Sequence, residues 1–138
     1  MSLKTPEPIQ IFTPLLTPEA KCRKIISKFK FQRFTPNTKM CTKEIFNSIC
    51  QSGQQGWAID DEEFHEGVRC IAAAIFDRES NVVDAVSLSG PKQRVVDNRL
   101  FEISAGVVAT AAAISKGLGY VPKVRGANLN FKRRSQDK

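Results

Sequence analysis

Two apolar runs separated by a short charged linker constrain the fold of this chain more than any other feature. Residues 68–76 and 82–89 are rich in Val, Ile and Ala, whereas residues 77–81 are charged or polar. Runs of this composition, joined by so short a polar linker, predict an antiparallel β-hairpin. Gly90-Pro91 is expected to break the second strand, because Gly and Pro punctuate regular structure.

Strand alternation sorts the hairpin residues into two faces. We expect Cys70 to lie opposite Ser87, and Val68 opposite Ser89. One face then collects small side chains, namely Val68, Cys70, Ala72 and Ala74 from the first strand and Val83, Ala85, Ser87 and Ser89 from the second. Such a face leaves a shallow hollow with hydroxyls and a thiol, which suits a polar ligand. It also allows a helix to pack closely, and periodicity alone favours this second interpretation.

The segment before the hairpin combines a short extended stretch with a run of acids. Trp57-Ala58-Ile59 reads as extended, and residues 60–63 are four consecutive carboxylates. Like charges repel one another, so this run predicts a solvated turn rather than a catalytic acid pair.

Three helices are predicted from capping residues and apolar spacing. The first begins at Thr17-Pro18 and reaches about Phe29, and the second runs from a Thr42 cap to about Gln55 and stops before Gly56. The third begins at an Asp97 cap and stops at Gly119, with inward positions Leu100, Ile103, Val107, Ala111, Ile114 and Leu118. Residues 1–16 are expected to be an irregular lead-in, and residues 121–138 a disordered tail.

The net charge of +7 is unevenly distributed. Residues 1–44 carry nine Lys and Arg against three acids, residues 45–120 carry six against ten, and residues 121–138 carry six against one. Charged ends are usually solvated extensions. A nucleic-acid-binding protein acting through the N-terminal helix and Lys132-Arg133-Arg134 is an alternative, although few aromatic residues lie between those charges for stacking.

Cysteine and histidine usage argues against a metal site, a cofactor and an enzyme. Four cysteines lie 19, 9 and 20 residues apart without a C-x-x-C pair, so we expect no zinc cluster and free thiols. Cys70 as nucleophile with His65 as base is the enzyme alternative, but no third group is evident to orient the base. No apolar signal segment follows Met1, and the uncharged run 103–115 is too short to span a bilayer, which predicts a soluble cytoplasmic protein.

An ordered series of motifs resembles the effector-binding domain of the IclR family of bacterial transcription regulators. The series consists of the stretches Gly56–Glu63, Glu66–Ala73, Phe76-Asp77 and Ser87–Pro91, with weaker similarity at Phe34–Thr38 and Ile114–Tyr120. Ordered matches at fixed spacing are more specific than any single short motif. The resemblance covers residues 17–120, about three quarters of the chain.

The resemblance implies an α+β, GAF/PAS-like domain in which helices pack on an antiparallel sheet. It implies a small organic acid or similar metabolite as ligand, with effector contacts at Asp60, Val68, Cys70, Ser87 and Ser89. The two serine hydroxyls would donate to a carboxylate, and the Cys70 thiol would be a weaker donor. Asp60 would accept from a ligand hydroxyl or hold a neighbouring backbone amide.

Parts of the family pattern have no counterpart in the sequence. Nothing before Thr17 resembles the family's winged helix-turn-helix, and the first strands of the sensing domain are also unmatched, so we expect a fragment that is incomplete at its N-terminal end. DNA contact is then expected only through the missing domain, and a homo-oligomer is implied. A non-sensing oligomerisation fragment or a degenerate remnant is the alternative. Asp84 also departs from the family, which places a small residue there, and a buried unpaired carboxylate would be costly.

Overall fold

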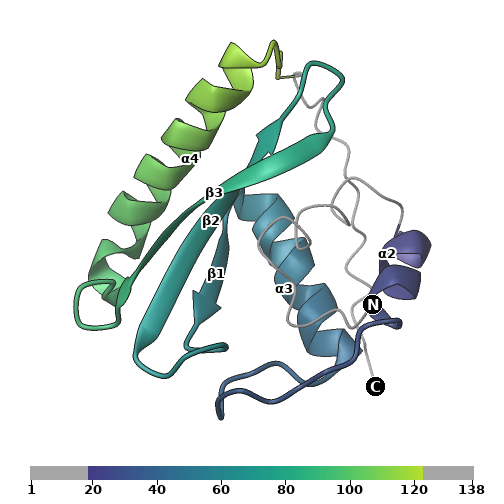
Figure 1. The fold of residues 1–138 in the computed structure, drawn as a ribbon, viewed down its shortest axis with the longest axis vertical. Coiled ribbons are helices and arrows are strands. Elements are labelled where there is room, and N and C mark those ends of the chain that lie inside the picture. Colours follow the sequence, from purple (N-terminus) through teal and green to yellow (C-terminus); the bar gives the residue numbers. More distant parts are fainter. Residues whose placement is uncertain (1–18, 123–138) are drawn as a thin grey trace, which may run out of the picture.

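The computed structural model describes residues 19–122 as three α-helices, one 3-10 helix and a three-stranded sheet. The strands are antiparallel in the order β1-β2-β3, which confirms the predicted α+β class and hairpin. In Figure 1, α4 lies on one side of the sheet and α3 with α2 on the other. The element bounds are α2 Glu19–Ile26, α3 Thr42–Gln55, β1 Ala58–Asp61, β2 Val68–Phe76, β3 Val82–Pro91, η2 Asp97–Arg99 and α4 Leu100–Gly117.

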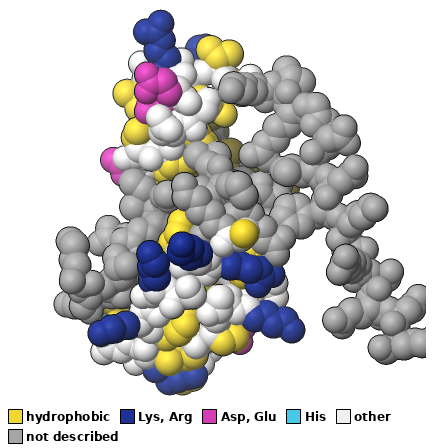
Figure 2. All heavy atoms as spheres, turned by 90° about the vertical axis from the view of Figure 1, so that its right-hand side faces the viewer, with side chains coloured by type: hydrophobic (Ala, Val, Ile, Leu, Met, Phe, Trp, Pro, Cys, Tyr) yellow, Lys and Arg dark blue, Asp and Glu magenta, His cyan; other side chains and the backbone are white. Residues whose placement is uncertain are grey.

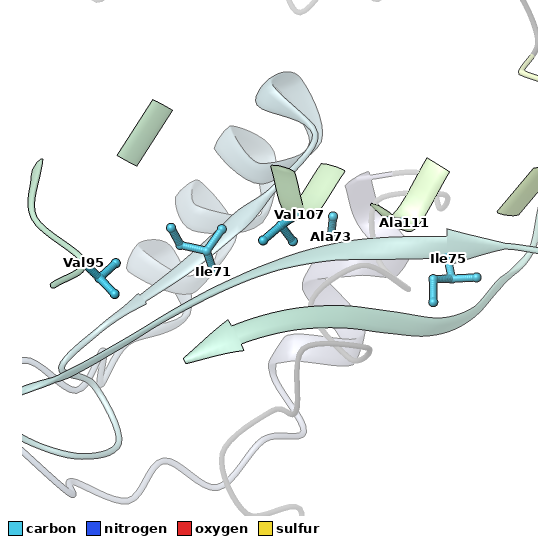
Figure 3. Packing of buried hydrophobic residues seen from close by; sticks show 6 residues of the cluster. All are labelled: Ile71, Ala73, Ile75, Val95, Val107 and Ala111. Carbon is cyan, nitrogen blue, oxygen red and sulfur yellow. The ribbon is translucent and has the colours of Figure 1, made fainter. Parts of the chain in front are cut away.

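The main core lies between α4 and the central strand β2. β2 contributes Ile71, Ala73 and Ile75, every second residue of the strand, and the helical side contributes Val95, Val107 and Ala111 (Figure 3). Ile71 has no exposed surface at all. Strand alternation therefore gives the odd-numbered residues of β2 to the α4 face.

A second cluster joins α2 to α3, and small residues cover the other face of the sheet. Cys22 and Ile26 of α2 pack against α3 residues Ile45, Phe46 and Ile49. The even-numbered face contributes Ala58, Ala72 and Ala74 as a separate cluster, with Phe76 and Val82 beside it. The face predicted to carry small side chains thus exists, and it is the face turned away from α4.

The register of the hairpin differs from the expected one by two residues. Cys70 pairs with Ser89, Ala72 with Ser87 and Val68 with Pro91. The expected pairing assumed a tight turn. Instead the Asp77 carboxylate accepts bonds from the Glu79 and Asn81 amides, each 2.9 Å long, and the ladder shifts between Ile75 and Phe76. Because the shift is two residues, Ala85, Ser87 and Ser89 keep their predicted face. Beyond the irregularity, Val82 rather than the predicted Val83 lies beside the small-residue cluster.

Two expectations about strand ends are wrong, and the costly buried carboxylate considered at Asp84 does not occur. β3 continues through Gly90-Pro91 rather than breaking there. β3 is an edge strand, where a residue without an N–H is tolerated. β1 extends into the acidic run as far as Asp61. Asp84 is exposed, and its carboxylate accepts a 2.8 Å bond from the Ala85 amide, so no buried charge arises.

The helices end at or near the predicted residues, but some of their capping residues differ from those predicted. α3 covers Thr42–Gln55 and ends at Gly56 with φ of 85°, as predicted, but Cys41 rather than Thr42 is its N-cap. α2 ends at Ile26, before the expected Phe29. Val96 is the residue before the 3-10 turn that leads into α4, and Asp97 makes no cap bond because its carboxylate contacts Arg69. The Thr17-Pro18 start, the lead-in 1–16 and the tail from residue 123 lie outside the described residues.

The buried face of α4 contains two serines that the apolar spacing did not predict. Val107 and Ala111 are buried as expected, but Ile114 and Leu118 are 41% and 49% exposed. Ser115 is buried instead, at 1% exposure. Its hydroxyl donates to the Ala111 carbonyl at 2.7 Å and accepts from the Phe76 amide at 3.0 Å, which fastens the end of β2 to α4. Ser104 is the other buried serine of α4.

Replacing Ser115 with Ala is expected to reduce the free energy of unfolding by about 1–3 kcal/mol, because the Phe76 amide would lose its acceptor near the core. Urea denaturation measures the change. Thr110→Ala is the matched control, since that hydroxyl bonds to the Gly106 carbonyl on the exposed face of the same helix. Equal losses in the two variants would contradict the prediction.

By length and composition alone, the helical stretch Asp97–Gly117 is apolar enough to cross a membrane, with a mean hydropathy of 1.2. It is longer than the uncharged run 103–115 considered above, because η2 and the first turn of α4 add to it. One side of this stretch packs against β2 through Val107, Ala111 and Ser115. Core helices of globular domains can have the same length and composition, but they are mostly buried. Here 22% of the apolar window is buried, so α4 packs on β2 along one side and leaves the rest of its surface exposed.

Candidate functional site

Three of the predicted effector contacts lie in one row across the sheet. Asp60 of β1 pairs with Cys70 of β2, and Cys70 pairs with Ser89 of β3. Ala58, Ala72 and Ser87 form the next row. Side chains in a row across adjacent strands share a face and stand about 4.5–5.5 Å apart. The sheet thus brings together a carboxylate, a thiol and two hydroxyls, with Val68 two residues before Cys70 in β2.

The exposure of this face changes from one side to the other. Ala58, Ala72 and Ala74 are buried, Asp60 and Cys70 are half-buried, and Ser87 and Ser89 are exposed. Val68 is 39% exposed. The face therefore has an apolar covered part near β1 and an accessible polar part along the edge strand β3.

Asp60 has a structural partner within its own loop. Its Oδ1 accepts a 2.7 Å bond from the Glu63 amide, which confirms the expectation that it could hold a neighbouring backbone amide. Partial burial raises the pKa of Asp60, and the charge of Lys39 opposes that rise. Desolvation of the carboxylate makes its charge costly, so a second anion beside it would be disfavoured unless Asp60 took up a proton.

The acidic run is not the solvated turn that four consecutive carboxylates predicted. Asp61 forms an ion pair with Arg69, Glu62 with Lys92 at 2.5 Å, and Glu63 with Lys39. Glu62 also accepts from the Gly67 amide at 2.9 Å. Each carboxylate points to a different cation or amide, so mutual repulsion is offset by separate partners.

The loop between α2 and α3 holds this acidic segment in place. The Thr35 hydroxyl donates to the Glu62 carbonyl, and the Thr38 hydroxyl donates to the Glu63 carbonyl at 2.5 Å. The Asn37 side-chain Nδ2 donates to the Asp61 carbonyl at 3.2 Å. Thr35 and Thr38 are both buried. The Thr-Pro-Asn-Thr motif, which entered the sequence analysis only as a resemblance, therefore has a physical role in supporting the end of β1.

Arg69 is a central residue of this region to which the sequence analysis gave no role. It is 6% exposed, on the α4 face of β2. Its Nε and Nη2 donate to the two Asp61 oxygens at 2.7 and 3.1 Å, and its Nη1 donates to the Asp97 carboxylate at 2.7 Å and the Val95 carbonyl at 2.9 Å. An Arg within an otherwise apolar strand was the available signal, because such a charge requires partners.

The described residues do not support the enzyme or metal alternatives. His65 lies in an exposed loop with its ring against Phe64, and no hydrogen bond joins it to Cys70. Within residues 19–122, no group of three or more His, Cys, Asp or Glu side chains gathers in a way that could hold a metal ion. Cys22, Cys41, Cys50 and Cys70 are not in disulfides.

Known proteins match most of this chain in sequence. The family described as "Bacterial transcriptional regulator IclR C-terminal" matches residues 15–116. The regulator XynR of Escherichia coli K12 is 33% identical over 102 residues, which are 74% of this chain and 40% of XynR. The repressor AllR of Salmonella paratyphi A is 37% identical over 100 residues, 72% of this chain and 37% of AllR. The chain therefore spans about two fifths of the length of these relatives.

A solved structure matches this chain in both fold and sequence. The C-terminal domain of the E. coli transcriptional regulator KdgR superimposes with a TM-score of 0.73 and 31% identity. The match covers 82% of this chain and 69% of the KdgR domain. The sheet, with its helices on both faces, is therefore the arrangement found in a regulator's C-terminal domain, and about a third of that domain has no matched counterpart here.

Proposed function

Because the chain belongs to the IclR family of bacterial transcriptional regulators, through the family's C-terminal domain, we propose that it senses a small organic acid on the small-residue face of its sheet. One observation carries this proposal. Asp60, Cys70 and Ser89 lie in one row across three strands, with Ser87 beside them, and the two serines are exposed. Concave sites with mainly apolar walls and a few placed donors are typical of ligand pockets.

The chemistry of this face favours a carboxylic acid that also carries a hydroxyl group. Ser87 and Ser89 supply hydroxyl donors for the carboxylate, and Val68 supplies apolar contact. The Cys70 thiol is a weaker donor. Asp60 already accepts one amide, and its remaining oxygen can accept from a ligand hydroxyl. The ligand carboxylate would lie towards β3, because the Asp60 charge disfavours an anion near β1.

We place this sensor in the bacterial cytoplasm, as part of a homo-oligomeric regulator. DNA recognition would then belong to a helix-turn-helix domain outside the part matched here. The second candidate is a non-sensing oligomerisation fragment. The incomplete match to the KdgR domain and the exposed edge strand β3 favour this alternative, since an unpaired edge promotes association. The two candidates differ in whether any small acid stabilises the fold.

A panel of aliphatic and aromatic hydroxy acids is expected to include at least one that raises the melting temperature. A ligand at about 100 times its Kd adds roughly 2.7 kcal/mol, which is several degrees for a domain of this size. The double variant Ser87→Ala/Ser89→Ala should lose most of that shift, because hydrogen bonds to a charged group contribute about 1.5–3 kcal/mol each. Differential scanning fluorimetry measures both effects.

The matched control is Ser27→Ala, which removes an exposed hydroxyl that donates to the Lys24 carbonyl, away from the sheet. It should keep the full ligand shift. A ligand-induced shift of the same size in the double variant would show that the ligand binds elsewhere than on this face. Absence of any shift across the panel, with self-association intact, would favour the oligomerisation fragment.

A further inference from the structure

The surface over α2 and the segment that follows it carries a cluster of positive charges. We call this surface the basic face, and it consists of the exposed residues Lys24, Lys28, Lys30, Arg33 and Lys43. Figure 2 shows Lys and Arg side chains gathered over the lower part of this side of the molecule, where α2 lies, with few acidic side chains among them. The basic face thus extends over α2, the segment after it and the start of α3.

The basic face is not neutralised by the described residues. Among the described side chains from Ala20 to Glu44, Glu44 is the one carboxylate, and it accepts from the Met40 amide at 3.3 Å. The four lysines form no ion pair within the described part of the chain, whereas Lys39 and Lys92 are paired with Glu63 and Glu62. A set of unpaired cations creates a positive potential that attracts polyanions.

The aromatic residues between these cations point into the protein. Phe29 and Phe31 are half-buried and pack against the α2–α3 cluster, while Lys28 and Lys30 are exposed. Phe34 is half-buried, and its ring is tilted by 50° against that of Phe64, with ring centroids 5.0 Å apart. Proteins that bind single strands require exposed rings on which bases stack. Amphipathic segments that bind bilayers require apolar side chains that can insert. The basic face offers charge without either.

We propose that the basic face binds the phosphate backbone of double-stranded DNA without sequence preference. Lysine ammonium groups act as point charges towards phosphates, and such contacts position a protein on a duplex without reading bases. This inference goes beyond the sensing function, and it differs from the expectation that DNA contact is made only by a helix-turn-helix domain. In a regulator, contacts of this kind add affinity to sequence-specific binding made elsewhere.

Two charge-matched variants of the full chain test the proposal. The basic-face variant carries Lys24→Gln, Lys28→Gln, Lys30→Gln and Lys43→Gln. The control carries Arg78→Gln, Arg94→Gln, Arg99→Gln and Lys116→Gln, which are also exposed but lie outside the basic face. Each variant loses four positive charges, so both have a formal net charge of 7 − 4 = +3. Because every substituted side chain is exposed, circular dichroism and melting temperature should match the parent chain.

Fluorescence anisotropy with a mixed-sequence DNA duplex measures the binding as salt is raised. Four phosphate contacts predict a slope of log K against log salt of about −3.6, which is a loss of about 100-fold between roughly 50 and 200 mM salt. The basic-face variant should bind on the order of 100-fold more weakly at the lower salt and lose most of the slope. The control variant should stay within about 3-fold of the parent chain.

Several results would overturn the proposal. Equal weakening in both variants would show that net charge alone is responsible. Loss of binding on neutralising Lys132, Arg133 and Arg134, with the basic-face variant unaffected, would assign binding to the tail. Tighter binding to single strands than to the duplex would show that the partner is single-stranded nucleic acid. Binding to anionic lipid vesicles but not to the duplex would show that the partner is a membrane surface.

Discussion

Replacing Asp61 with Ala is expected to lower the free energy of unfolding by about 2 kcal/mol, although Asp61 itself is partly exposed. The reason is Arg69, which is 6% exposed and donates two of its hydrogen bonds to the Asp61 carboxylate. Removing one partner of a buried charge leaves the other uncompensated, at a typical cost of roughly 3–5 kcal/mol. Asp61 is 44% exposed, so solvent screening places the expected cost below that range.

The same contact predicts a dependence on pH. The hydrogen bond from Arg69 lowers the pKa of Asp61, and Arg69 remains charged because both carboxylates raise its pKa further. A carboxyl with a lowered folded pKa contributes stability above its unfolded pKa of about 3.9, and this is lost as pH falls through the folded value. The difference in the free energy of unfolding between the parent chain and Asp61→Ala should therefore have its full size at neutral pH and become smaller below about pH 4.

Two control variants distinguish the cost of leaving the buried Arg69 charge without its partner from the cost of losing any ion pair. Asp97→Ala should cost at most about 1 kcal/mol, because the Asp97 side chain is 83% exposed. Arg69→Met should cost less than Asp61→Ala, because it removes the buried charge and keeps most of the volume. Urea denaturation of the three variants gives the order. If Asp61→Ala were no more harmful than Asp97→Ala, the bidentate contact would not stabilise the fold.

Residue pattern alone predicted the elements of this fold and the two faces of β2, because both depend on local geometry. Alternation in residues 68–76 requires the odd positions to share one face, whatever the register. The register itself depended on the turn, where the Asp77 side chain captures two amides and enlarges the loop. Local pattern could therefore place Cys70, Ser87 and Ser89 on one face, but it could not show that Ser89, rather than Ser87, is the neighbour of Cys70.

Contacts between distant segments account for what the sequence did not predict. Asp97 has the features of a helix cap, but Arg69, 28 residues earlier in the chain, takes its carboxylate. The acidic run 60–63 has the features of a solvated turn, but Lys39, Arg69 and Lys92 come from three separate segments to pair with it. Charged side chains choose partners by proximity in the fold, which a single sequence does not show.

Replacing Ile71 with Ala is expected to lower the free energy of unfolding by about 3 kcal/mol, within the roughly 2–5 kcal/mol found for large-to-small core changes. Ile71 has no exposed surface and lies at the centre of the sheet, between β1 and β3 and beneath α4. Strands on both sides hold its backbone, so neighbouring side chains can collapse only partly into the cavity. Chemical denaturation followed by circular dichroism measures the loss.

The matched control is Ile114→Ala, which deletes the same atoms from a position that apolar spacing also predicted to be inward. Ile114 is 41% exposed, because Ser115 takes the buried position beside the end of β2. Its replacement should cost less than about 1 kcal/mol, since the lost burial is partial and alanine favours the helix. A cost at Ile114 equal to that at Ile71 would mean that α4 is rotated relative to the sheet, with the apolar stripe rather than Ser115 facing β2.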